Sequence, residues 1–254
     1  MNVFSTVAEE APVIKKVWNV VDWFITNFKL SVGASVVAII LGAMLCMAIP
    51  YLLGSISPAI LISRRVCGTD IRTVGKKKAS TYNMLLSFGP KMALANAVCE
   101  FFIGFVSIWI GRLIWEANGA GLALFMVVFG NLFPVFHRMS GGKGIVTMIG
   151  AAAALNPIVA LLLVVVFLLA VIGSKLVAFG SVAITLLFAL FVRSLANDGL
   201  QLAMAVFVTG VLLLVHWPDF RRVQEGEEEK FYISEYINFK RKKKDEDAEG
   251  DNDE

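Results

Sequence analysis

Long apolar segments, separated by short polar ones, follow one another along most of the chain. Two examples are "SVVAIILGAMLCMAIPYLLG" and "IVALLLVVVFLLAVIG", and a helix needs about 20 mostly apolar residues to cross a bilayer. We predict about seven spans. The range is five to seven, because the fourth span is short and could form a tilted or re-entrant pair with the fifth. The predicted spans cover residues 33–61, 89–115, 119–137, 144–155, 157–173, 177–194 and 199–216.

The fold class that follows is an all-α polytopic membrane protein with an amphipathic N-terminal helix. The chain has 254 residues and is 57% hydrophobic, which disfavours the alternative, a soluble all-α protein with buried helices. We divide it into an N-terminal interfacial segment (1–32), a transmembrane domain (33–222) and a charged tail (223–254). "VIKKVWNVVDWFITNFKL" mixes apolar, aromatic and charged residues. That mixture favours a helix lying in the membrane interface over a span or a cleavable signal peptide.

Charges are distributed unequally between alternate loops. The loop between the first two predicted spans is strongly basic, as are the "GGKG" loop and the start of the tail, whereas the opposite loops carry few cations. The positive-inside rule therefore predicts a multi-pass protein of the cell (inner) membrane, with the N-terminus outside and the C-terminus in the cytoplasm. The basic part of the tail, "FKRKKK", suits anionic lipid headgroups, and a solvated stop-transfer tail is the plainer alternative.

The stretch "SGGKGIVT" places Lys143 among Gly141, Gly142 and Gly144 at the start of a predicted helix. Glycines let backbone amides approach an anion, the helix N-terminus adds a favourable dipole, and the lysine supplies a cation. The motif is not a Walker A loop, since Gly144 stands where Ser or Thr follows the lysine. We predict a phosphate-binding loop. A flexible turn with a snorkelling lysine is the alternative.

Other polar candidates fall on the same predicted face. Ser55 and Ser181 each follow a glycine, and either hydroxyl is able to donate to phosphate or to its own helix backbone. Arg72 suits a bidentate phosphate contact or a positive-inside anchor. His216, which has Asp219 three residues on to orient it, is a candidate proton acceptor. The three cysteines show no paired spacing, so neither a disulfide framework nor a metal site is indicated.

Glu100 lies inside the apolar stretch "MALANAVCEFFIGFVSIWIG". An ionisable group within a span is costly to bury and is a functional candidate for that reason. The alternative is a glutamate near the end of a tilted helix, paired with Lys91 or Lys76.

Four blocks in this order, "GSISPAILISRRVCGTDIRTVG", "GNLFPVFHRMSGGKGIVT", "SKLVAFGSV" and "HWPDFRRVQEGEE", resemble the bacterial acyl-phosphate:glycerol-3-phosphate acyltransferase family. The resemblance covers roughly residues 40–230. It implies a multi-span membrane enzyme that moves a fatty acyl group from acyl phosphate to glycerol 3-phosphate. The products are lysophosphatidate and inorganic phosphate, and no metal, nucleotide or other cofactor is implied.

The resemblance also suggests roles for single residues. His216, Lys143 and Ser181 are expected to be catalytic, although a substrate phosphate oxygen is an alternative base to His216. The expected phosphate-binding residues are Gly141, Gly142, Lys143, Gly144, Ser55, Arg72, Asn83, Ser181 and Asp219.

The chain departs from the family pattern at polar positions. Lys76, Lys77 and Lys78 replace Ser-Gly-Asn, Tyr82 replaces threonine, Leu86 stands in the place of an arginine and Ile103 in that of a lysine, and Asp219 takes the place of an asparagine. One interpretation is a diverged enzyme in which the lysine run compensates for the lost cations. Another is a non-catalytic paralogue that binds a lipid or sugar phosphate, and a small membrane transporter is a third.

Overall fold

The computed structural model describes residues 19–195 and 199–226, so most of the predicted N-terminal segment and of the charged tail lies outside the described residues. The described part is helical, with no β-strand among its elements. The helices are α1 (Val20–Asn27), α2 (Val32–Gly54), α3 (Pro58–Val66), α4 (Thr81–Phe88), α5 (Pro90–Leu132), the short 3-10 turn η2 (Val135–His137), α6 (Ile145–Leu155), α7 (Pro157–Ser174), α8 (Val177–Leu195) and α9 (Gly199–Gln224).

The helices have the length and composition of a multi-pass membrane protein, as predicted. Four stretches are long and apolar enough to cross a bilayer, and α6 and α8 are shorter apolar helices. The four stretches are Val32–Val66, Pro90–His137, Pro157–Ser174 and Gly199–Gln224. Large apolar side chains of α7, including Leu161, Leu169 and Ile172, are exposed, as expected of a helix that faces lipid rather than water.

The long helix α5 is two antiparallel segments joined by a tight turn. Trp115 and Glu116 leave the helical conformation, with φ of −149° and 42°. The chain reverses so sharply that a Cβ atom built on Gly119 would lie 2.0 Å from the carbonyl oxygen of Gly111. Only glycine fits such a backbone approach. The turn falls where the sequence predicts one span to end and the next to begin.

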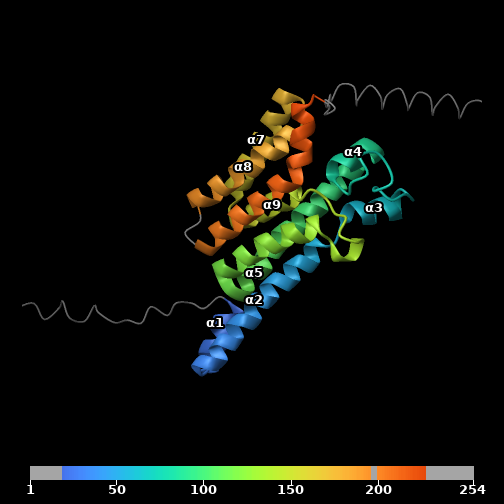
Figure 1. Cartoon of the computed structure of the whole chain (residues 1–254). Coiled ribbons are helices and arrows are strands. Elements are labelled where there is room, and N and C mark those ends of the chain that lie inside the picture. Colours follow the sequence, from blue (N-terminus) through green and yellow to red (C-terminus); the bar gives the residue numbers. More distant parts are fainter. Residues whose placement is uncertain (1–18, 196–198, 227–254) are drawn as a thin grey trace, which may run out of the picture.

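The first predicted span, 33–61, is not one continuous helix. Helix α2 stops at Gly54 and α3 begins at Pro58, with Ser57 extended between them at φ −98° and ψ 101°. The ring of a proline disfavours the helical conformation of the residue before it, and proline itself is well suited to the first helical position. The break leaves α3 as a separate short helix at the end of the bundle (Figure 1).

The predicted amphipathic segment contains α1, a helix of 8 residues. Asn19 caps it by accepting a hydrogen bond from the backbone of Asp22. Val21 is buried against Gly42 of α2, while Trp23 and Phe28 are exposed. One apolar side chain therefore packs on the bundle, and the aromatic ones suit a membrane interface.

The α5 turn, the α6–α7 junction and the start of α9 lie at one end of the bundle. Arg112 donates to the carbonyl of Leu155 at 3.2 Å, and Gly121 packs against the backbone of Gln201. The loops at 67–80 and 133–144 adjoin the opposite ends of the two α5 segments, and α9 also finishes at that end. Figure 1 shows α7, α8 and α9 grouped together, with α2 lying along α5 and with α3 and α4 at one end. The loops at 67–80 and 133–144 and the end of α9 therefore share a face, as predicted.

Candidate active site

Asn131, near the end of α5, holds the "GGKG" loop in place through two hydrogen bonds. The backbone oxygen of Asn131 accepts from the Gly142 amide at 3.1 Å, and its side-chain oxygen accepts from the Gly144 amide at 3.1 Å. Gly144 has a left-handed backbone (φ 72°) and is the N-cap of α6. A Cβ on Gly141 would lie 2.0 Å from the Asn131 carbonyl oxygen. The glycines thus permit close packing, and two of the amides expected at a phosphate are occupied by Asn131.

Lys143 projects from this loop to a fully buried carboxylate. Its Nζ lies 2.5 Å from Oδ2 of Asp219, which is 0% exposed. Arg222, one turn further along α9, binds the other carboxylate oxygen. The contact between Lys143 and Asp219 joins residues that are 76 positions apart in the chain. Asp219 therefore holds two cations at the site through charge-assisted hydrogen bonds.

His216 is buried on the same helix, one turn before Asp219. Its Nδ1 lies 2.8 Å from the carbonyl oxygen of Leu212. Because a carbonyl oxygen only accepts, Nδ1 carries the hydrogen in this contact, so Nε2 of the uncharged form of the ring is the nitrogen that can accept a proton. That Nε2 is buried and has no hydrogen-bond partner in the described part of the chain. The recorded partner that orients the ring is Leu212, and not Asp219 as the three-residue spacing suggested.

Lys78, from the lysine run, is a third cation near this group. It acts electrostatically on both His216 and Asp219. Lys76 instead stacks over the ring of Tyr82, with its Nζ 5.2 Å from the ring centroid. Lys143, Arg222 and Lys78 together exceed the single charge of Asp219, so the surroundings of His216 stay cationic.

The remaining predicted residues make mostly structural contacts. Asn83 is fully buried, and its amide nitrogen donates to the carbonyls of Ile71, Val74 and Lys78, so it orders the lysine loop. The Ser55 hydroxyl accepts from the Val135 amide at 3.3 Å. The Ser181 hydroxyl donates to the carbonyl of Val177 within α8 at 3.0 Å. The Ser181 contact matches the local backbone role that the sequence left open, whereas the Ser55 contact joins α2 to a segment 80 residues further along the chain.

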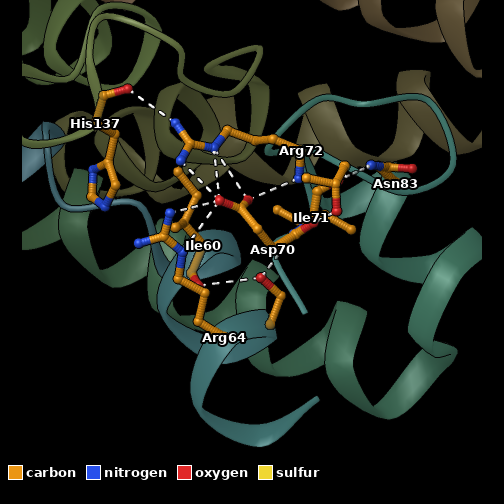
Figure 2. A network of polar contacts seen from close by, with 9 residues as sticks. Ile60, Arg64, Asp70, Ile71, Arg72, Asn83 and His137 are labelled. Atoms are coloured by element: carbon orange, nitrogen blue, oxygen red, sulfur yellow. Dashed lines mark hydrogen bonds and ion pairs between the residues drawn. The ribbon is translucent and has the colours of Figure 1, made fainter. Parts of the chain in front are cut away.

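Arg72 belongs to a separate polar network beside the site. Figure 2 shows Arg64 and Arg72 pointing at Asp70, and Arg72 also donates to the carbonyl of His137 at 3.1 Å. The hydrogen bonds from Arg72, reinforced by Arg64, hold the pKa of the Asp70 carboxyl well below its usual range. The aspartate fixes the direction of both guanidinium groups.

Glu100 has polar partners rather than a lysine. It accepts from Asn96 at 3.1 Å and from Thr81 at 3.3 Å, and it is 5% exposed. Thr81 begins α4, directly after the lysine loop. Glu100 therefore joins that loop to the interior of α5, and its hydrogen bonds go to Asn96 and Thr81 in place of the alternative pairing with Lys91 or Lys76.

Sequence reasoning missed Asn131 and Arg222. Asn131 lies at the end of an apolar run, "MVVFGNLFPVF", where we predicted only a span. The side-chain amide of Asn131 within that apolar run could have indicated a structural role, because a buried polar group needs hydrogen-bond partners. Arg222 follows Asp219 by three residues, and side chains at this spacing on a helix are neighbours.

The fold and this buried, cation-rich site define a class of multi-pass helical membrane proteins, and comparison with known proteins identifies the family. The family model described as glycerol-3-phosphate acyltransferase matches residues 44–226, so the chain belongs to this family. The resemblance drawn from the four sequence blocks is confirmed.

Individual relatives agree with the family assignment. The glycerol-3-phosphate acyltransferase of Finegoldia magna is 31% identical over 71% of this chain and 91% of its own length. That of Clostridioides difficile is 31% identical over 72% and 92%. Among solved structures, the integral membrane glycerol 3-phosphate acyltransferase PlsY in its glycerol 3-phosphate form matches with a TM-score of 0.72 and 26% identity. The match covers 77% of this chain and 98% of that one.

Proposed function

We propose that this chain transfers a fatty acyl group from an acyl phosphate to the 1-hydroxyl of glycerol 3-phosphate. The family assignment supports the reaction class, and the observation that carries the proposal is the group of cations around the buried His216. Both substrates bring phosphate, so the site needs positive charge. The acyl chain needs apolar surroundings, and the helices that carry the site residues are apolar along most of their length.

In the proposed reaction, the hydroxyl oxygen of glycerol 3-phosphate attacks the carbonyl carbon of the acyl phosphate. The bond from that carbon to the phosphate oxygen breaks, and the hydroxyl proton passes to Nε2 of His216 and then to the departing phosphate. The products are lysophosphatidate and inorganic phosphate. An acyl phosphate is already activated, so no covalent enzyme intermediate is needed.

Lys143 is proposed to neutralise phosphate charge as it develops on the leaving group. The first-turn amides of α6 and Lys78 add to this effect. Asn83 and Asn131 act by ordering the two loops, while Ser55 and Ser181 remain proposed phosphate ligands at the edge of the site. Arg72, bound to Asp70 and to the carbonyl of His137, lies outside this group. Asp219 holds Lys143 and Arg222 in place until a phosphate arrives.

For the location, we propose the inner membrane with the site loops in the cytoplasm. The basic loops at 64–78 and 138–143 support this orientation through the positive-inside rule. The polar acceptor would enter from the aqueous side and the acyl donor from the bilayer.

The test is product formation by the purified chain in nanodiscs. Palmitoyl phosphate and radiolabelled glycerol 3-phosphate are expected to give lysophosphatidate and an equal amount of inorganic phosphate. Substrate binding without any product would overturn the proposal and favour a non-catalytic paralogue. That alternative is considered because Leu86 stands in the place of an arginine of the family.

A further inference from the structure

A pocket of about 630 Å³ lies beside the site, on the loop face of the molecule. The residues that catalysis is proposed to use, Lys143, His216 and Asp219, are not among those that line it. Its wall comes from the end of α3, the loop after it and the segment between α5 and α6. The lining residues are Arg64, Asp70, Arg72, Thr73, Phe136, His137, Arg138 and Ser140.

The pocket has an excess of positive charge. Three arginines line it against one carboxylate. Asp70 engages Arg64 and Arg72 and so aims their planar groups at one place (Figure 2). For Arg138, no ion pair is recorded with any residue that the structure describes. Guanidinium groups held in fixed directions are suited to the oxygens of a phosphate.

Apolar side chains surround Arg138 on its own segment. Val135 is 48% exposed, Phe136 61% and Met139 58%. Arg138 and Met139 both have left-handed backbones, with φ of 55° and 57°, which turns this segment sharply. The segment directly follows the apolar helix α5, so its exposed apolar groups lie where a bilayer interface begins.

We infer that this pocket binds the phosphate of an anionic phospholipid headgroup, with the acyl chains passing beside Phe136 and Met139. A cationic pocket with an exposed apolar edge matches the two halves of such a lipid. A free phosphate ester would satisfy the arginines but leave the apolar edge in water. The site is additional to the proposed transfer reaction and does not depend on it.

The experiment titrates the purified full chain in detergent with dioctanoyl phosphatidylglycerol and measures the dissociation constant by native mass spectrometry. Arg64→Gln and Arg138→Gln are each expected to weaken binding by roughly fivefold. Arg65→Gln is the matched control, because Arg65 is exposed in the same turn of α3 and does not line the pocket. Its dissociation constant is expected to equal that of the wild type.

Two further ligands distinguish the source of the phosphate. Dioctanoyl phosphatidylcholine is expected to bind more weakly than phosphatidylglycerol, and glycerol 3-phosphate is expected not to displace the bound lipid. Equal binding of both lipids, displacement by glycerol 3-phosphate, or the same loss in Arg65→Gln would overturn the inference. Lys143→Ala is expected to retain lipid binding, which separates this site from failure of the proposed reaction.

Discussion

Asp219 is the residue that most changes how this site is understood. Its buried carboxylate occupies Lys143 and Arg222, the cations that a phosphate would otherwise use. Lys143 and Arg222 keep 23% and 41% of their side chains exposed, so either is able to move towards a ligand while remaining solvated. An arriving phosphate therefore competes with Asp219, and the carboxylate lowers the affinity of the site for anions.

Replacing this carboxylate by the isosteric amide should strengthen phosphate binding. Asp219→Asn is expected to lower the KM for glycerol 3-phosphate or for acyl phosphate by at least roughly fivefold, the effect of about 1 kcal/mol of relieved repulsion. Steady-state kinetics in nanodiscs measures it. Glu225→Gln is the control, since Glu225 is an exposed carboxylate directly after the end of α9, paired with Arg221. An unchanged or higher KM in Asp219→Asn would show that Asp219 does not compete with phosphate.

At this scale the sequence identified the types of residue but not their pairing. "GGKG", His216 and Asp219 were visible as motifs, because glycine, lysine and histidine at helix ends have distinctive chemistry. The Lys143–Asp219 contact joins two distant segments, and no local spacing predicts it. The three-residue spacing from His216 to Asp219 was misleading, since two cations compete for the carboxylate more strongly than a neutral ring does.

At the scale of secondary-structure elements, most helices lie where the apolar stretches of the sequence predicted them. The turn within α5 was predicted within a few residues, and α6, α7 and α8 begin and end near the predicted positions. The break within the first predicted span was missed because the apolar composition continues on both sides of Ser57 and Pro58, while backbone geometry interrupts the helix there. Hydropathy measures only transfer into lipid, so it does not detect such a break.

The glycine pair at the α5 turn should be intolerant of any side chain. Gly119→Ala is expected to destabilise the fold by roughly 1–3 kcal/mol, because the added methyl group must push two backbones apart. Thermal unfolding in detergent measures this. Gly210→Ala in α9 is the control, since a Cβ there meets nothing within 4 Å. Equal melting temperatures for the two variants would contradict the close approach of Gly111 and Gly119.

Across the whole molecule, the arrangement of helices explains how a soluble and a lipid substrate reach one site. Helix α6 has 11 residues, about 16 Å of helix, against a hydrocarbon thickness of about 30 Å. It runs alongside the first segment of α5, with Thr147 against Gly104 and Leu155 near Arg112. The "GGKG" loop therefore begins below the ends of the longer helices, within reach of an acyl chain in the bilayer.

This arrangement predicts which loops share a side of the membrane. Lys77→Cys in the lysine loop and Glu116→Cys in the α5 turn lie at opposite ends of the first α5 segment. In intact cells, with Cys67 and Cys99 replaced by serine, a membrane-impermeant maleimide is expected to label Glu116→Cys only. After cell disruption it is expected to label both. Labelling of Lys77→Cys in intact cells would contradict the cytoplasmic placement of the site.

The most direct test of the proposed reaction is the rate of lysophosphatidate formation by Lys143→Ala relative to the wild type. Both are assayed with palmitoyl phosphate and glycerol 3-phosphate in nanodiscs, and Lys77→Ala serves as the control because Lys77 is exposed. Removing a group that stabilises developing charge typically costs about 100-fold or more in rate. We expect a loss of that size for Lys143→Ala and a rate close to wild type for Lys77→Ala. A folded Lys143→Ala variant with the wild-type rate would contradict the central role of the "GGKG" lysine.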